Sequence, residues 1–247
     1  MAEPAETELW VDLLGLIVRL HDREADLPLL VGLRDADIAG ALAGLLAQSS
    51  DPGAAAGFRQ ALDELGDNPP EAVLDQLACD FADVYLTHGL RISPSGSVWL
   101  TEEHLERQQP MFDVRAWYEH YGIAVPDWRC RADDHVVHEL QFVQHLLALG
   151  DGDGLADAAL FMDRHLLPWV PDFCRAIEER AHSAFHRAAA RLTRAVLEML
   201  RRWLEARTGI DSTVVDHAFA REQDRARKAA EVKQVARPFV PGLAESW

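Results

Sequence analysis

The chain has 247 residues, enough to bury a sizeable core in one large domain or two small ones. Hydrophobic residues make up 49% and charged residues 26%, as in ordinary soluble globular proteins. Its 24 basic and 41 acidic side chains give a formal net charge of -17, which argues against nucleic acid and anionic membranes as partners. The acidic surface either serves solubility or forms a docking face for a basic peptide.

Two features of the sequence indicate a cytoplasmic protein. Cys79, Cys130 and Cys174 are widely spaced and include no C-x-x-C pair, so we expect buried, reduced thiols. The N-terminal residues MAEPAETELW lack a basic region before an apolar run, and no segment reaches the roughly 18 consecutive apolar residues of a membrane span. We therefore expect neither a signal peptide nor membrane insertion.

The first half of the chain is typical of helices, because apolar residues recur every three or four positions and do not alternate as in strands. Such stripes lie at residues 9–20, 38–46, 58–65 and 74–85. The stretch from Thr87 to Pro110 is different, since it is rich in Gly, Pro, Ser and Thr. It predicts a long loop, and long loops are often functional or mobile.

Helices are also expected in the second half. A short one at residues 112–121 is followed by irregular chain at 122–131. The next helix, at residues 133–149, begins with acidic residues, which cap helix N-termini and stabilise them. The GDGDG run at residues 150–154 predicts a flexible linker. Further helices are expected at residues 155–165, 168–181 and 182–208.

The pattern as a whole predicts an all-α fold. We expect a single helical-bundle domain of about ten helices at residues 1–220. The long loop separates an N-terminal half (1–110) from a C-terminal half (111–220), and residues 221–247 form a charged, loosely held tail.

The helix that follows Asp133 carries the most informative pattern. On a wheel at about 100° per residue it has a narrow apolar stripe and an opposite polar face. The stripe consists of Val136, Leu140, Val143 and Leu147, and the polar face of Asp134, His138, Gln141 and His145. His135 and Glu139 lie between them, four residues apart, so their side chains can meet. Because Glu139 borders the stripe, its carboxylate needs a partner, which could be His135, a backbone donor or an incoming arginine.

Metal and nucleotide chemistry have weaker signals. His135 with Glu139, and His182 with His186, have the spacing of helical metal-ligand pairs. No H-E-x-x-H motif, phosphate-binding loop or G-x-S-x-G motif accompanies them. We expect no metal and no cofactor, and a helical metal- or nucleotide-dependent enzyme that uses the His and Glu residues stays as the alternative to a binding protein.

Three stretches, in order along the chain, resemble the motifs of the TorD/DmsD/NarJ-type redox-enzyme maturation chaperones. Residues 93–100, SPSGSVWL, are similar to the family's P-P-Y-E-S-V-Y-L loop. The D-H-x-x-x-E-L-x-F signature matches Asp134, His135, Glu139, Leu140 and Phe142. The F-x-x-x-H-L-x-x-W-x-x-x-F segment matches Phe161, His165, Leu166, Trp169 and Phe173. The resemblance extends over residues 81–203.

The chain departs from the family pattern in the first motif. Ser95 and Gly96 stand where the family's loop has Tyr and Glu. The resemblance therefore leaves Asp134 and Glu139 with more of any arginine-binding role.

The resemblance implies a cytoplasmic chaperone and not an enzyme. Such a protein binds the N-terminal twin-arginine leader of the apo catalytic subunit of a molybdenum oxidoreductase, and assists cofactor insertion, assembly and export. It acts as a monomer or dimer. The peptide-binding residues that it implies are Pro94, Ser97, Trp99, Asp134, His135, Glu139, Phe142, His165 and Trp169. For Trp169 the alternative is an ordinary core position, and for Asp134 a helix cap.

Overall fold

The structure, a computed structural model, describes residues 4–214 of the chain, so the expected tail at 221–247 lies outside the described residues. Residues 4–214 form eleven α-helices and one π-helical turn, and they contain no β-strand, which confirms the all-α prediction. The elements are α1 (Pro4–Asp22), α2 (Leu27–Asp35), α3 (Ile38–Leu46), α4 (Ala54–Leu65), α5 (Glu71–Tyr85), α6 (Gly96–Leu100), α7 (Gln109–His120), α8 (Val136–Leu149), α9 (Gly152–Phe161), η1 (Met162–Leu166), α10 (Val170–Arg180) and α11 (Ala184–Thr208).

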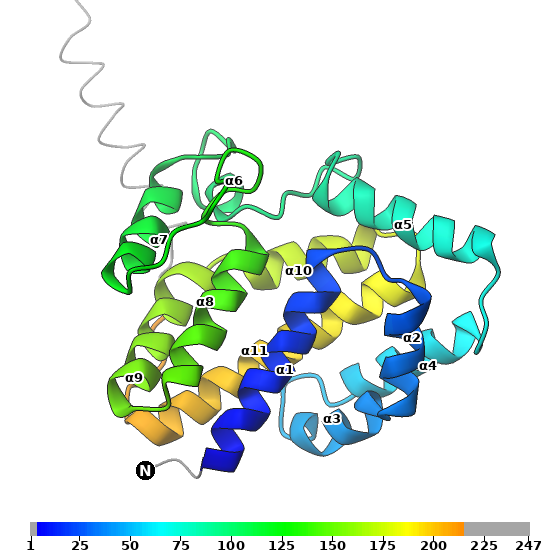
Figure 1. Cartoon of the computed structure of the whole chain (residues 1–247), viewed down its shortest axis with the longest axis horizontal. Helices are drawn as coiled ribbons and strands as arrows, with labels where there is room; N and C mark the ends of the chain where they lie inside the picture. Colours follow the sequence, from blue (N-terminus) through cyan, green and yellow to red (C-terminus); the bar gives the residue numbers. More distant parts are fainter. Residues whose placement is uncertain (1–3, 215–247) are drawn as a thin grey trace, which may run out of the picture. The chain divides into compact units, whose positions relative to one another are not determined.

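Helices α1, α8 and α11 form the centre of the fold. In Figure 1, α1 crosses in front of the long helix α11, with α8 and α9 on one side and α2, α3 and α4 on the other. The α8 helix packs along α1, while α11 contacts α4, α9 and α10. Helices from both halves of the chain therefore contribute to one hydrophobic core.

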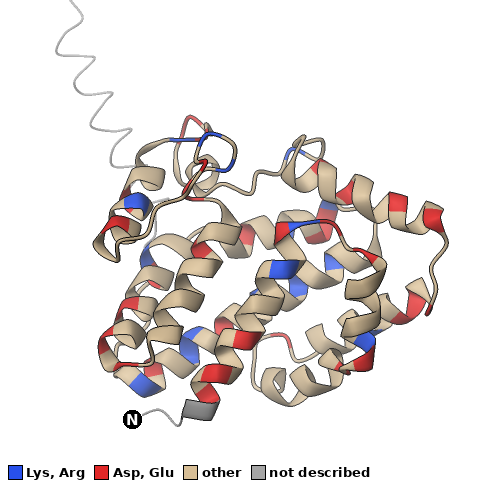
Figure 2. Cartoon of the chain, viewed as in Figure 1, with Lys and Arg blue, Asp and Glu red and all other residues tan. Residues whose placement is uncertain are grey.

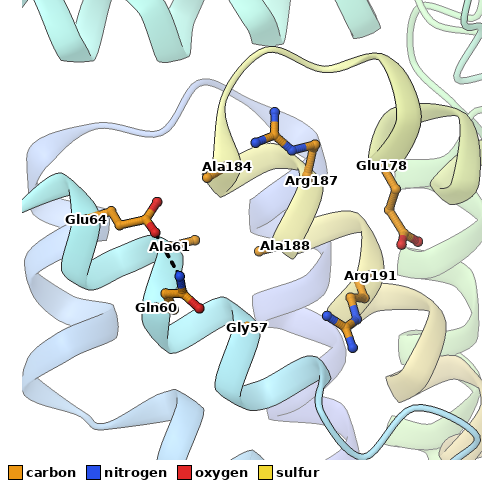
Figure 3. Close-up of a pocket in the computed structure, with 9 residues that line it drawn as sticks. All are labelled: Gly57, Gln60, Ala61, Glu64, Glu178, Ala184, Arg187, Ala188 and Arg191. Carbon is orange, nitrogen blue, oxygen red and sulfur yellow. Dashed lines mark hydrogen bonds between the residues drawn. The ribbon is translucent and has the colours of Figure 1, made fainter.

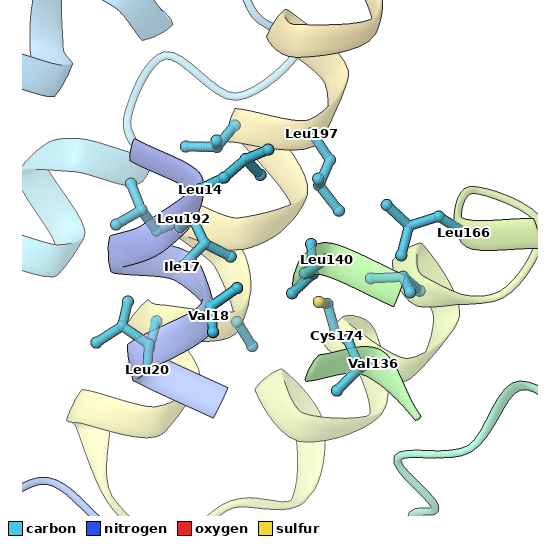
Figure 4. Packing of buried hydrophobic residues seen from close by; sticks show 14 of the residues in the cluster. Leu14, Ile17, Val18, Leu20, Val136, Leu140, Leu166, Cys174, Leu192 and Leu197 are labelled. Carbon is cyan, nitrogen blue, oxygen red and sulfur yellow. The ribbon is translucent and has the colours of Figure 1, made fainter. Parts of the chain in front are cut away.

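The apolar stripes expected from the sequence meet in this core. Leu14 and Ile17 of α1, Leu140 of α8 and Leu192 of α11 are fully buried. Figure 4 shows them lying close together around a common interior. The whole stripe predicted on α8 is fully buried, which confirms that part of the wheel: Val136, Leu140, Val143 and Leu147.

Local signals set the ends of the helices. Asp37 caps α3, because its carboxylate accepts a hydrogen bond from the Gly40 N–H at 3.2 Å. The Ser183 hydroxyl caps α11 in the same way by accepting from the His186 N–H. Gly209, at a φ of 70°, ends α11 in the left-handed conformation that favours glycine. The predicted last helix at residues 182–208 is thereby confirmed within two residues.

Several boundaries differ from the expectation. The α2 helix was not expected, and α6 lies inside the stretch expected to be a loop. The run at residues 150–154 is mostly not a linker, since Asp151 accepts from the Gly154 N–H at 2.7 Å and α9 begins at Gly152. An Asp that can cap turns a glycine-rich stretch into a helix start.

The cysteine expectation is wrong for two of the three thiols. Cys174 is buried in the core, whereas Cys79 and Cys130 are exposed. No helix among residues 4–214 has the length and apolarity needed to cross a membrane.

Replacing Leu140 by alanine should lower the free energy of unfolding by about 2–5 kcal/mol, because the change leaves a cavity in a closely packed core. Urea denaturation measures the loss. Leu149→Ala is the matched control, since Leu149 lies on the same helix with 45% of its surface exposed and should change stability far less. Equal effects of the two substitutions would contradict the central position of Leu140.

Candidate functional site

The short helix α6 and the start of α8 are joined by backbone hydrogen bonds. The Gly96 N–H donates to the Asp134 carbonyl at 2.8 Å, and the Val136 N–H donates to the Pro94 carbonyl at 2.8 Å. Between these bonds, Ser95 and His135 face each other as an isolated antiparallel bridge. The first two family-like motifs therefore form one structural unit, and Trp169 of the third motif contacts it through Glu139 and Gly96. We call the following eight residues the motif cluster: Pro94, Ser95, Gly96, Ser97, Asp134, His135, Glu139 and Trp169.

Asp134 lies inside this cluster and not on a wet helix face. Its side chain is fully buried, and Oδ2 accepts hydrogen bonds from the Ser97 N–H and the Ser97 hydroxyl, both at 2.6 Å. Its Oδ1 has no hydrogen-bond partner within the described part of the chain. Burial raises the pKa of this carboxyl, although the bonds from Ser97 oppose the shift.

The expected cap on α8 was assigned to the wrong residue. The helix begins at Val136, and its cap is His135, whose Nδ1 accepts from the Val137 N–H at 3.2 Å. Asp134 precedes the helix, so the helical wheel does not describe it, and its carboxylate turns toward Ser97 of α6 instead.

The partner of Glu139 lies on a third element. Only 1% of the Glu139 surface is exposed, and Oε2 accepts a hydrogen bond from the Trp169 indole N–H at 3.2 Å. Burial raises the pKa of Glu139 well above its usual range, and the neighbouring Asp134 raises it further. The partner is therefore Trp169, while His135 uses its Nδ1 to cap its own helix.

Gly96 brings α6 into close contact with these groups. A Cβ at position 96 would lie 3.0 Å from the Trp169 indole nitrogen and 3.4 Å from Glu139 Oε1. Trp169 and Phe173 are fully buried with ring centroids 5.7 Å apart, which confirms that both are core positions. Absence of a side chain at position 96 thus allows the α6 backbone to rest on the Trp169 ring.

Trp99 closes the α6 side of the cluster. Its indole N–H donates to the Ser93 carbonyl at 2.8 Å, and its half-buried ring meets Phe173 edge-on at 6.3 Å. The Ser97 hydroxyl also accepts from the Gln108 N–H at 3.2 Å, which ties α6 to the start of α7.

Besides Trp99, two further expected site residues lie outside the motif cluster. Phe142 is 3% exposed among aromatic rings and lines a cavity of about 270 Å³ together with His138, His145 and residues 123–126. His165, on η1, lines a different hollow of about 570 Å³ beside Trp117 of α7. The structure thus brings together six of the nine expected residues, with Trp99 at the edge of the group.

Sequence reasoning missed the residues that hold the chain just before α8. Arg115 of α7 forms a two-point ion pair with Asp133, at 3.2 and 2.8 Å. The Tyr118 hydroxyl donates to the Asp133 carbonyl at 3.0 Å. The hydrogen bonds that Arg115 donates to the Asp133 carboxylate raise the pKa of Arg115. Arginine and aspartate 18 positions apart leave no local signal in a sequence.

Charges and cavities elsewhere do not centre on the motif cluster. Acidic residues are spread over helices throughout the described part (Figure 2). A cavity of about 390 Å³ lies between α4 and α11 and is lined by small residues and by charged ones such as Arg187 and Glu64. Figure 3 shows the side chains that line it. It shares no lining residue with the motif cluster. Within residues 4–214, no group of three or more His, Cys, Asp or Glu side chains is placed to hold a metal ion.

The chemistry available at the motif cluster is that of two buried carboxyl groups with few donors. Burying a carboxylate costs stability unless it is paired, and Asp134 Oδ1 has no hydrogen-bond partner among the described residues, which makes this cluster the candidate binding site. The group that best complements two carboxylates is a guanidinium, which presents five N–H donors in a plane.

Comparison with known proteins adds a family match. A family model described as nitrate reductase delta subunit matches residues 51–175, which include the whole motif cluster. Similar proteins include three named chaperone protein TorD. One from Vibrio vulnificus is 26% identical over 146 residues, covering 55% of this chain and 66% of that protein. One from Photobacterium profundum is 28% identical over 144 residues, with the same coverage.

A third, from Vibrio cholerae, is 27% identical over 132 residues, covering 50% of this chain and 60% of that protein. The chain therefore spans at most 66% of the length of these curated relatives.

Glu139→Gln should stabilise the protein at neutral pH. As the pH rises above the ordinary glutamate pKa of 4.5, the unfolded chain releases a proton that folded Glu139 retains, so the free energy of unfolding falls. Glutamine does not titrate and can still accept from Trp169. We expect the variant to match the native protein near pH 4 and to exceed its stability at pH 7 by about 1 kcal/mol or more.

Urea denaturation across this pH range measures the difference. Glu119→Gln, on the exposed side of α7, is the control and should leave the profile unchanged. A Glu139→Gln protein that is less stable than the native one at pH 7 would contradict a costly buried carboxyl.

Proposed function

The chain belongs to the nitrate reductase delta subunit family of redox-enzyme maturation chaperones, and on this premise we propose that it is a chaperone for one molybdenum oxidoreductase. It binds the N-terminal twin-arginine leader of the apo catalytic subunit in the cytoplasm. Bound there, it delays export while the cofactor is inserted and the enzyme is assembled. It performs no reaction of its own.

The observation that carries the proposal is the position of the family match. Residues 51–175 run from the approach to α4 into α10 and contain α6, the start of α8 and Trp169. These are the parts that the structure joins into the motif cluster. The relatives named TorD chaperones support the same assignment.

The chemistry of a twin-arginine leader supports it as well. Such a leader carries two adjacent arginines followed by an apolar stretch. Asp134 and Glu139 offer carboxylate oxygens, which bind guanidinium groups in a bidentate manner more strongly than they bind lysine. The cavity beside Phe142, walled by Ile123 and Val125, offers an apolar pocket for a leader side chain.

A metal- or nucleotide-dependent enzyme is the weaker candidate. The i,i+4 pairs that suggested it are engaged otherwise: His135 caps α8, and the His186 Nδ1 lies 2.8 Å from the Ser183 hydroxyl. Neither contact requires a ligand.

Calorimetric titration with leader peptides tests the proposal. The peptides are the leaders of the molybdenum oxidoreductases encoded in the same genome. One of them should bind with an affinity of about 1 μM or tighter. The same peptide with Lys-Lys in place of Arg-Arg should bind more weakly, because lysine cannot pair with a carboxylate through two parallel bonds.

Glu139→Gln should weaken binding of that leader more than binding of its Lys-Lys form, because glutamine cannot ionise and so cannot pair with a guanidinium through two parallel bonds. Glu119→Gln again serves as the control for a general loss of negative charge. If no leader in the set binds the native chain, the proposal that this protein recognises a leader is wrong.

A further inference from the structure

The two acids of the motif cluster cannot be reached from solution in the described structure. Asp134 is fully buried and Glu139 is 1% exposed. The segment that packs directly on both acids is the α6 segment, which we define as residues 93–100. A leader arginine can contact these carboxylates only if some part of their surroundings moves.

The hydrogen bonds of Asp134 and Glu139 indicate which part of the structure moves. Among the described residues, the two carboxyl groups accept from three donors: the Ser97 N–H, the Ser97 hydroxyl and the Trp169 indole N–H. Two of these donors belong to the α6 segment. Asp134 Oδ1 has no donor among residues 4–214, although a carboxylate has about four acceptor positions. The pair is short of donors, and a guanidinium supplies five.

The attachment of the α6 segment to α8 is also limited. Helix α6 has five residues, and the backbone bonds to α8 are those of Gly96 and Val136. Its other contacts are those of Ser97 with Asp134 and with the Gln108 N–H at the start of α7, of Gly96 with the Trp169 ring, and of Trp99 with Phe173 of α10. Lifting the segment therefore breaks contacts with α7, α8 and α10 and withdraws the buried Leu100 from the core.

Strained residues lie at both ends of this segment. His88 and Arg91 precede it with φ values of 53° and 55°, and His104 and Arg107 follow it with values of 51° and 59°. Residues other than glycine rarely adopt this left-handed region, and they keep it only where the surrounding structure holds them there. Among the described residues, only Asp37 is another case. The α6 segment is thus flanked on each side by two residues in this conformation.

From these observations we propose that the α6 segment is a cover over Asp134 and Glu139, which lifts and is replaced there by an arginine guanidinium of the client leader. The inference rests on the proposed function. In the closed form Ser97 supplies the hydrogen bonds that the guanidinium supplies in the complex. Ser97 is then a positioning residue that holds the cover shut, and leader binding includes an opening step.

A reversible disulfide tests the opening step. Ser95 and His135 face each other between the Gly96 and Val136 bonds, so they form a non-hydrogen-bonded pair of an antiparallel bridge. Such pairs have Cα atoms about 4.5 Å apart, within the span of a disulfide. The variant is Ser95→Cys/His135→Cys in a full-length chain that also carries Cys79→Ser and Cys130→Ser, because those two thiols are exposed.

Leader binding is measured on the same protein before and after reduction, with the peptide that binds the native chain. The oxidised form should associate with the leader at least about tenfold more slowly, because its binding-competent state is depopulated, and reduction should restore the rate. Equal rates for the two forms would overturn the cover and leave the proposed function intact. Failure of every leader to bind the native chain would overturn the proposed function instead.

A second variant keeps His135, because replacing this cap of α8 could by itself change binding. Ser97→Ala removes the two hydroxyl bonds that tie the cover to Asp134 and to the Gln108 N–H, so association should become severalfold faster while the protein becomes less stable. Ser49→Ala is the matched control, since the buried Ser49 hydroxyl donates to the Leu46 carbonyl at 2.8 Å far along the chain from α6. It should lose stability without faster association. Unchanged or slower association by Ser97→Ala contradicts the inference.

Discussion

The carboxylate of Asp134 organises the site, because it is the point at which two distant motifs become one structure. Its Oδ2 accepts both polar hydrogens of Ser97, and the backbone bridge on either side fixes the α6 segment against the first turn of α8. A single acceptor thus replaces the cap that the five-residue α6 helix lacks within its own sequence. Around it, Gly96 meets Trp169, Trp169 meets Glu139, and the three family-like motifs are held in one place.

Most of the stability comes from the apolar core, to which the motif cluster contributes Trp169. The part of the core between α1, α8 and α11 is made mainly of aliphatic stripes. The motif cluster lies at the N-terminal end of α8 and contains the two buried carboxyl groups, which are costly to bury. A guanidinium that pairs with Asp134 and Glu139 would supply hydrogen-bond donors that these carboxyl groups lack, so its binding would favour the open state.

Sequence periodicity predicted the core well and the site poorly, for a physical reason. The spacing of Val136 and Leu140 along one helix predicts that both are buried, and any apolar neighbour can pack against them. Asp134 depends on Ser97, which lies 37 positions away, and Glu139 depends on Trp169, which lies 30 positions away. The helical wheel could show that Glu139 needs a partner but not which one. It also misplaced Asp134, because it continued a helix beyond its actual cap at His135.

Position 96 explains how the acids come to be covered in this chain. The resemblance places glutamate there in the family's loop, whereas this chain has Gly96. A side chain at that position would begin 3.0 Å from the Trp169 nitrogen and close to Glu139, so either the ring or the α6 backbone would have to shift. A glutamate would further bring a third negative charge against two carboxyl groups, which disfavours the closed packing by like-charge repulsion. The close packing of α6 against Trp169 and the acid pair therefore depends on glycine at this position.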